Sequence, residues 1–190
     1  MARIVLKIGS NILTGKNGGL DQSRINSIAK DVLEICEKSN EIVIVSSGAV
    51  AAGMKKLGLK EKPKEIRLKQ AAAAVGQSSL MWAYEKSFNS FGKKVAQVLL
   101  TRDDFSDRMR YLNSKNTIIT LLSYGIIPVI NENDTVATDE IKFGDNDQLA
   151  ALVSGLIDAD RLIILSDVDG FYSADPKRDR DAKIIHFIEK

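Results

Sequence analysis

Two polar clusters in the second half of the sequence hold most of its candidate chemistry. The first is Asn131-Glu132-Asn133-Asp134, which begins where the apolar run of residues 126–130 ends, and the second is Gly144-Asp145-Asn146-Asp147. Such a run is typical of a buried strand, whose carboxyl end borders the ligand-binding edge of an open α/β sheet. Carboxylates suit an ammonium group and amides suit a carboxylate. The clusters therefore predict a site for a small zwitterion, with one acid left to organise a cationic catalytic site.

The alternative for the second cluster is structural, because Asp145 or Asn146 could simply cap the helix that follows. That alternative leaves Asn131, Asn133 and Asp134 unexplained. Polar groups this dense need partners when they are partly buried, and a bound ligand would supply them.

The segment Lys7-Ile8-Gly9-Ser10-Asn11 follows an apolar segment at the N-terminus. Lys7 could present its ammonium group to an anionic ligand, and Gly9 would let backbone N–H groups approach that ligand closely. The alternative is an exposed lysine beside a glycine turn. The segment is not a Walker A loop, because five residues rather than four separate Gly9 from Gly15, and Asn17 stands where Ser or Thr is required.

Two more predicted strand ends carry polar residues. Ser46-Ser47-Gly48-Ala49 lies between a strand and a helix, where free N–H groups form an anion site, although either serine could be only the helix cap. Ser166 and Asp167 begin the segment that ends at Tyr172, and they could bind Mg²⁺ or the ribose and phosphates of a nucleotide. Asp169-Gly170 within it is a standard turn pair.

Strands that are apolar on both faces alternate with helices along the chain. This pattern predicts an α/β fold, a three-layer αβα sandwich with a mostly parallel central sheet, as one domain over residues 1–190. Expected strands cover residues 3–8, 41–45, 95–100, 126–130 and 161–165, and expected helices cover 21–39, 47–57, 64–91, 111–123 and 145–157, with a short last element over 183–188. A hairpin is expected between Asp134 and Gly144, and a surface loop with helix caps at Asp103–Arg108.

Composition excludes several classes of function. The chain has 190 residues and a net charge of +2, so electrostatics does not favour nucleic-acid or membrane binding. Apolar stretches are too short to span a bilayer, and the N-terminus lacks a signal-peptide core, which indicates a cytoplasmic protein. Cys36 is the only cysteine and is expected to fill space in the core. The single histidine, His186, is remote from every cluster. No Cys/His metal-ligand spacing is present, and a Ser-His-Asp hydrolase is disfavoured.

Taken together, these segments resemble the amino acid kinase family, and within it the branch that phosphorylates glutamate. The resemblance extends over nearly the whole chain, in order, and includes Ala73–Gln77 and Gln97–Thr101. It implies ATP-dependent phosphorylation of the L-glutamate γ-carboxylate to γ-glutamyl phosphate, the first step of proline biosynthesis, with ATP and Mg²⁺ as cofactors. It also implies a homo-oligomer and feedback inhibition by proline at or near the glutamate site.

The resemblance also implies a role for each matching residue. Lys7 would stabilise the transferring phosphoryl group, and Asp147 would orient the active-site lysines. The glutamate-binding residues would be Ser47, Gly48, Ala49, Asp134 and Asn146, and the nucleotide-binding residues would be Lys7, Gly9, Ser166 and Asp167. Phosphoryl transfer to a carboxylate needs alignment and charge dispersal but no histidine or covalent nucleophile, which agrees with this residue set.

The family pattern continues beyond Lys190 with a glycine-rich segment ending in Thr-Lys, whose lysine is a second phosphate contact. The domain is therefore expected to be C-terminally incomplete, and without the C-terminal RNA-binding-like domain of some relatives. Two alternatives stay open: a family member acting on another acid or a nucleoside monophosphate, and a non-catalytic sensor of glutamate or proline. The acids of the two clusters argue against a phosphorylated substrate, because they would repel it.

Overall fold

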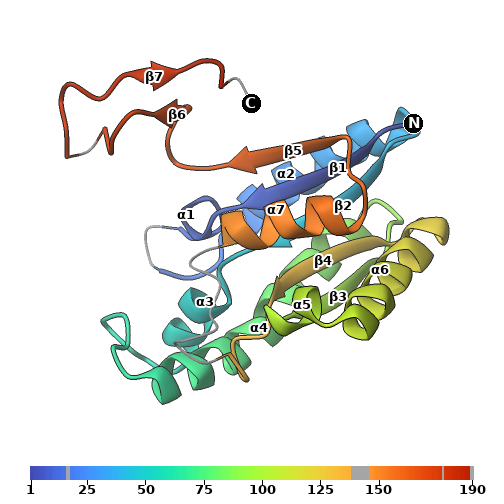
Figure 1. Ribbon diagram of the computed structural model, residues 1–190. Helices are drawn as coiled ribbons and strands as arrows, with labels where there is room; N and C mark the ends of the chain where they lie inside the picture. Colours follow the sequence, from blue (N-terminus) through green and yellow to red (C-terminus); the bar gives the residue numbers. More distant parts are fainter. Residues whose placement is uncertain (16–17, 138–145, 177, 189–190) are drawn as a thin grey trace.

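A five-stranded parallel sheet forms the centre of the molecule (Figure 1). The computed structural model describes residues 1–15, 18–137, 146–176 and 178–188. Strand order is β3-β4-β2-β1-β5. The strands are β1 Arg3–Ile8, β2 Glu41–Ser46, β3 Val95–Leu100, β4 Ile127–Glu132 and β5 Arg161–Leu165. Because all four pairings are parallel, the carboxyl ends of the five strands meet at one edge of the sheet.

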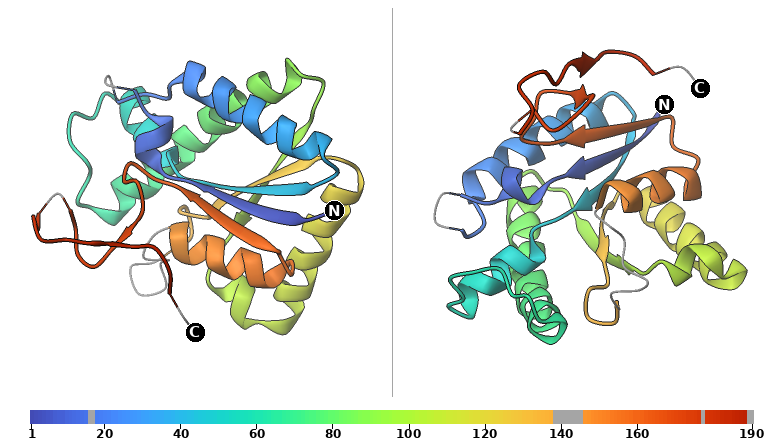
Figure 2. Two further views of the ribbon diagram at one scale, coloured as in Figure 1. Left: turned by 90° about the horizontal axis from the view of Figure 1, so that it is seen from above. Right: turned by 60° about the vertical axis from the view of Figure 1, so that its left-hand side comes forward.

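Helices cover both faces of this sheet (Figure 2). On one face lie α2 Gln22–Glu37, α3 Ala49–Lys56 and α4 Ile66–Asn89, and on the other lie α6 Arg108–Ser123 and α7 Asn146–Leu156. Alternate residues of β1 serve the two layers, since Ile4 and Leu6 join the first core and Val5 the second. The predicted three-layer αβα sandwich is thus confirmed. None of the helices in the described residues is long and apolar enough to cross a bilayer.

Two short helices and a hairpin complete the described structure. They are α1 Ser10–Leu13, α5 Asp103–Ser106 and the antiparallel pair of β6 Phe171–Tyr172 with β7 Ile184–Ile185. The expected surface loop at Asp103–Arg108 is wrong, because these residues form α5 and begin α6. One expected cap is present, because Asp107 is the N-cap of α6 and accepts from the Arg110 N–H at 2.9 Å, whereas α5 has no side-chain cap.

Strand β4 is longer than its apolar run indicated. The sequence placed Asn131 and Glu132 after the strand, but both are buried within it. The reason is backbone pairing: Asn131 lies opposite Leu99 of β3 and Glu132 opposite Leu100, so the ladder continues through the polar residues. The first polar cluster is therefore split between the last residues of a strand and the turn that follows.

Strand β5 was expected to be buried and is not. It pairs with β1 and lies at the edge of the five-stranded sheet, where Leu162, Ile163 and Ile164 are exposed, Ile164 to 47%. An apolar segment indicates a strand, but its position in the sheet depends on pairing with other segments. The hairpin expected between Asp134 and Gly144 lies outside the described residues, as do Gly144 and Asp145 themselves.

Helices α3 and α4 approach each other unusually closely. A Cβ atom added at Gly53 of α3 would lie 1.7 Å from the Ala72 carbonyl oxygen of α4, and one added at Gly76 of α4 would lie 1.8 Å from the Ala49 carbonyl oxygen. Glycine is required at both positions because any side chain would collide with backbone. This contact sets α3, and with it the segment after β2, against α4.

Candidate active site

The Asn146 side chain connects three segments at the carboxyl edge of the sheet. Asn146 is the first residue of α7, and its amide nitrogen lies 3.0 Å from the Ser46 carbonyl oxygen, 2.9 Å from Ser47 Oγ and 3.1 Å from Asn131 Oδ1. These acceptors come from the end of β2 and from β4. Two residues predicted to bind substrate, Ser47 and Asn146, are thus in direct contact. The alternative that Asn146 serves only its own helix is insufficient.

Lys7 and Asp147 form an ion pair beside this amide. The distance from Lys7 Nζ to Asp147 Oδ1 is 2.6 Å, and the lysine side chain is largely buried while the carboxylate is partly exposed. A buried ammonium group is costly unless a carboxylate or a similar partner compensates it. Since Asp147 follows Asn146 directly, the first turn of α7 contacts both the β2 edge and the end of β1 (Arg3–Ile8).

Neither Ser46 nor Ser47 caps α3, so the alternative that these serines serve only as a helix cap is wrong. The N-cap residue is Gly48, whose φ of +105° is in the left-handed region, and no side chain caps the helix. Ser47 instead accepts from Asn146, and the Ser46 hydroxyl is 2.8 Å from the Tyr84 hydroxyl. The first-turn N–H groups of α3, including that of Ala49, are thus left without a side-chain cap beside Ser47, an arrangement that favours an anionic ligand group.

Two residues of α4 belong to this site although the sequence did not single them out for chemistry. Tyr84 is fully buried against Ser46, and burial raises the pKa of its phenol. Gln77 accepts from the Asn131 amide at 3.0 Å, and its own buried amide nitrogen has no hydrogen-bond partner among the described residues. Helical spacing could have indicated these two residues from the sequence, because Gln77 lies two turns before Tyr84 on the packed side of α4.

The residues predicted to contact nucleotide lie at the neighbouring strand ends. The Gly9 N–H donates to the Leu165 carbonyl at 3.1 Å, so this group is engaged within the protein. A Cβ at Gly9 would lie 3.7 Å from Lys7 Nζ, so glycine keeps the space beside the ammonium group open. Asn11 donates to Asp167 at 3.2 Å and links the turn after β1 to the segment after β5. Ser166, next to Asp167, is exposed.

Asp169 lies in a bend between β5 and β6. Its carboxylate accepts from the Tyr172 hydroxyl at 2.7 Å. This hydrogen bond holds the pKa of Asp169 below its usual value and raises the pKa of Tyr172.

Asp134 lies in the turn after β4, half-buried. The preceding Asn133 organises that turn, because its N–H donates to the Leu100 carbonyl at 2.8 Å and its carbonyl accepts from Val136 and Ala137. The turn therefore begins at the ends of β3 and β4, on the same edge of the sheet as Asn146.

The described carboxylates at this edge do not form a metal cage. Among the described residues, no group of three His, Cys, Asp or Glu side chains could hold a metal ion. Asp147 is paired with Lys7, and Asp167 with Asn11. The described carboxylates would hold Mg²⁺ together with ATP phosphates, which is the usual mode for an ion that keeps several waters.

Comparisons with known proteins agree with this architecture. The family model described as "Amino acid kinase family" matches residues 2–190. The glutamate 5-kinase of Geobacter sp. (strain M21) is 57% identical over 186 residues, which cover 98% of this chain and 50% of that protein. The glutamate 5-kinase of Caldanaerobacter subterraneus subsp. tengcongensis is 53% identical over 188 residues, again covering 50% of its length. The chain thus spans about half the length of the curated relatives it matches.

A solved structure shares the fold. The crystal structure of UMP kinase from Bacillus anthracis superposes with a TM-score of 0.61 at 17% sequence identity, covering 96% of this chain and 72% of that one.

Proposed function

The chain belongs to the amino acid kinase family, and from that premise we propose that it phosphorylates the γ-carboxylate of L-glutamate with ATP, as the amino acid kinase domain of a glutamate 5-kinase. The products are γ-glutamyl phosphate and ADP, in the first step of proline biosynthesis. One observation carries the proposal: consecutive residues at the start of α7, Asn146 and Asp147, contact Ser47 on one side and Lys7 on the other. An amide-and-hydroxyl pair suited to a carboxylate therefore adjoins an ammonium group suited to a phosphate.

In this proposal glutamate binds between α3 and the two polar clusters. The uncapped N-terminus of α3, at Gly48 and Ala49, together with Ser47 and Asn146, receives carboxylate oxygens. Asp134 supplies the negative charge that an α-ammonium group requires. Since the acceptor oxygen is already anionic, no protein base is needed at that atom.

The reaction forms a bond between a γ-carboxylate oxygen of glutamate and the γ-phosphorus of ATP, while the bond from that phosphorus to the ADP oxygen breaks. The Lys7 ammonium group neutralises charge on the transferred phosphoryl group, and Asp147 holds that ammonium group in place through the 2.6 Å ion pair. Gly9 keeps room beside the ammonium group, and Ser166 and Asp167 line the nucleotide side. Mg²⁺, bound with ATP, supplies further charge neutralisation on the phosphates.

The proposal includes three properties of the whole protein. Proline binds at or near the glutamate site as a feedback inhibitor, the protein assembles from several copies of itself, and it works in the cytoplasm, where ATP is available. The supporting observation is the 53–57% identity to curated glutamate 5-kinases over the length of this chain.

The test separates binding from turnover. L-glutamate binding to residues 1–190 is measured by calorimetry, and γ-glutamyl hydroxamate formation is measured with ATP, Mg²⁺ and hydroxylamine. The assay uses this chain and a chimera that joins it to the second half of the Geobacter sp. (strain M21) relative. We expect hydroxamate from the chimera. A folded chimera that binds glutamate without forming product would favour the sensor alternative, and one that neither binds nor reacts would refute the proposal.

A further inference from the structure

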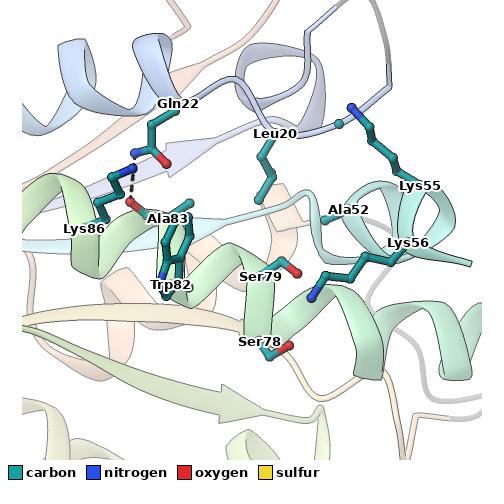
Figure 3. A pocket seen from close by; sticks show the side chains of 11 residues that line it. Leu20, Gln22, Ala52, Lys55, Lys56, Ser78, Ser79, Trp82, Ala83 and Lys86 are labelled. Carbon is teal, nitrogen blue, oxygen red and sulfur yellow. Dashed lines mark hydrogen bonds between the residues drawn. The ribbon is translucent and has the colours of Figure 1, made fainter.

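A basic pocket lies between α3, α4 and the start of α2, and its lining shares no residue with the candidate active site. Its volume is about 770 Å³, within the usual range for a small-ligand site. The lining residues come from α3, α4, the start of α2 and the segment before it (Figure 3), and the charge and shape arguments use Gly19, Lys55, Lys56, Ser79, Trp82 and Lys86. We propose that this pocket binds a small phosphorylated ligand.

Charge is the first argument. Three lysines, Lys55, Lys56 and Lys86, line the pocket, and its described lining contains no aspartate or glutamate. Within the described part of the chain, none of the three lysines forms an ion pair with a carboxylate. Each lies in the last turn of its helix, where a cation also stabilises the negative end of the helix dipole. That effect explains the lysines individually, but it does not explain why three of them face one acid-free cavity.

Shape is the second argument. Figure 3 shows Lys55 and Lys56 on one side of the pocket, Trp82 and Lys86 on the other, and Ser79 between them. The Lys55 side chain crosses directly over buried Gly19, since a Cβ at that position would lie 2.5 Å from Lys55 Cδ and 2.7 Å from Nζ. The absence of a side chain at Gly19 thus lets the ammonium group lie against the pocket wall.

One hydroxyl group and one aromatic ring make the pocket more than a charged surface. Ser79 lines the pocket, and its buried hydroxyl has no hydrogen-bond partner among the described residues. Trp82 is 61% exposed, and the Lys86 ammonium nitrogen lies 5.0 Å from its ring centroid. Lysine binds phosphate as a point charge, and an exposed indole beside it can contact the rest of a phosphorylated ligand.

The wall behind Trp82 is held in place by hydrogen bonds. The Gln22 amide donates to Ser87 Oγ at 2.7 Å and to the Ala83 carbonyl at 3.1 Å, joining the start of α2 to α4. On the other side, the glycine contacts between α3 and α4 fix the helix that carries Lys55 and Lys56. The lysines therefore project from a preformed frame.

Trp82 is the only tryptophan of the chain, so emission excited selectively at tryptophan reports on the surroundings of this pocket. The probes are pyrophosphate, which offers phosphate groups only, and ADP, which adds a ring system. We expect both to change Trp82 emission saturably, and the doubly substituted Lys55→Gln/Lys56→Gln protein to raise the apparent Kd about tenfold or more. Lys38→Gln/Lys94→Gln, an equal change of charge at exposed lysines outside this pocket, is the matched control and should leave Kd unchanged.

Three results would overturn the proposal: no saturable change with either probe, equal weakening in both double variants, or emission that follows protein concentration instead of probe. The last result, checked by sedimentation velocity, would identify this face as a contact between copies of the chain. Tighter binding of ADP than of pyrophosphate would show that Trp82 contacts the ring system of the ligand. Equal binding would show that the pocket recognises only the phosphate groups. Fluorescence does not require phosphoryl transfer, so failure of the proposed kinase activity leaves this test intact.

Discussion

Lys7 and Asp147 show how a single contact organises the candidate site. The ammonium group is largely buried at the end of β1 (Arg3–Ile8), and its described partner carboxylate belongs to the first turn of α7. The neighbouring Asn146 amide is engaged with Ser47 and Asn131. Two adjacent residues therefore hold a cation and a carboxylate-binding surface in a fixed relation, which is the relation that phosphoryl transfer to an acid requires.

Replacing the carboxylate tests that relation. Asp147→Asn should lower the rate of hydroxamate formation about 10²-fold or more, because Lys7 loses the charge that positions it, while glutamate binding stays nearly unchanged. The measurement is kcat together with calorimetric glutamate affinity in the chimera that carries this chain. The control is Asp158→Asn, which removes the exposed Lys115–Asp158 pair at 2.7 Å and should leave turnover intact. Turnover equal to that of the parent protein would refute the role given to Asp147.

Tyr84 makes the stability of the folded chain depend on pH. Its buried phenol bonds to Ser46, and burial raises its pKa above the value of about 10 expected in the unfolded chain. The neutral phenol therefore contributes stability that is complete below about pH 10 and is lost as pH rises toward the folded-state pKa. We expect the free energy of unfolding to fall above about pH 10.

The comparison is urea denaturation of the parent protein, Tyr84→Phe and Tyr124→Phe across neutral and alkaline pH. Tyr84→Phe should lose about 1–2 kcal/mol at neutral pH, because it removes the buried hydrogen bond to Ser46, and should show a shallower alkaline decline. Tyr124, which is exposed, should match the parent protein at every pH. Parallel alkaline curves for all three proteins would contradict the assignment to Tyr84.

At the scale of elements, the pair α3–α4 is the rigid part on which both the candidate site and the basic pocket depend. The N-terminal end of α3 carries Gly48 beside Ser47, and the C-terminal end of the same helix carries Lys55 and Lys56. Gly53 and Gly76 permit the close contact between the helices. A change at this contact is therefore expected to affect both sites at once.

Alanine substitutions test the contact. Gly53→Ala and Gly76→Ala should each lower the free energy of unfolding by about 1–3 kcal/mol or more, because the new methyl group meets backbone that must shift. Gly155→Ala in α7 is the matched control: a Cβ there meets nothing within 4 Å, and its φ is not in the left-handed region. It should raise helix stability by about 0.5–1 kcal/mol. The free energy of unfolding of the three variants is measured by chemical denaturation. If Gly53→Ala leaves it unchanged, α3 and α4 can separate without cost.

At the scale of the whole molecule, stability should fall from the centre of the sheet to β5. Strands β1 and β2 have neighbours on both sides and are buried, whereas β5 pairs with β1 at the edge of the five-stranded sheet and is exposed. Backbone groups with few buried apolar neighbours open more readily.

Amide hydrogen exchange measures this gradient. Amides of Leu162 to Ile164 should exchange about tenfold or more faster than those of Val5 and Val43 under native conditions. The comparison is internal, since all these amides belong to strands of one sheet. Equal protection in β5 and β1 would mean that the edge is covered in solution.

The sequence alone determined the kind of fold and the position of the polar segments along it. Apolar periodicity is a local property, so β1 and β3 were predicted at their observed bounds, and Lys7, Ser47 and Asn146 were placed at strand or helix ends without any tertiary information. The helix start at residue 21 was placed for the same reason, and Asp21 caps α2 there by accepting from the Ser23 and Arg24 N–H groups.

Only the tertiary structure decided which of these residues meet. The Asn146 contact to Ser46 joins residues 100 positions apart, and the Asn131 contact to Gln77 joins residues 54 apart. Such contacts depend on strand order and helix packing, which arise from the cooperative burial of many segments and are not encoded in any one of them. That is why the polar residues of β4, the support from Tyr84 and the exposed edge at β5 became visible only in the folded chain.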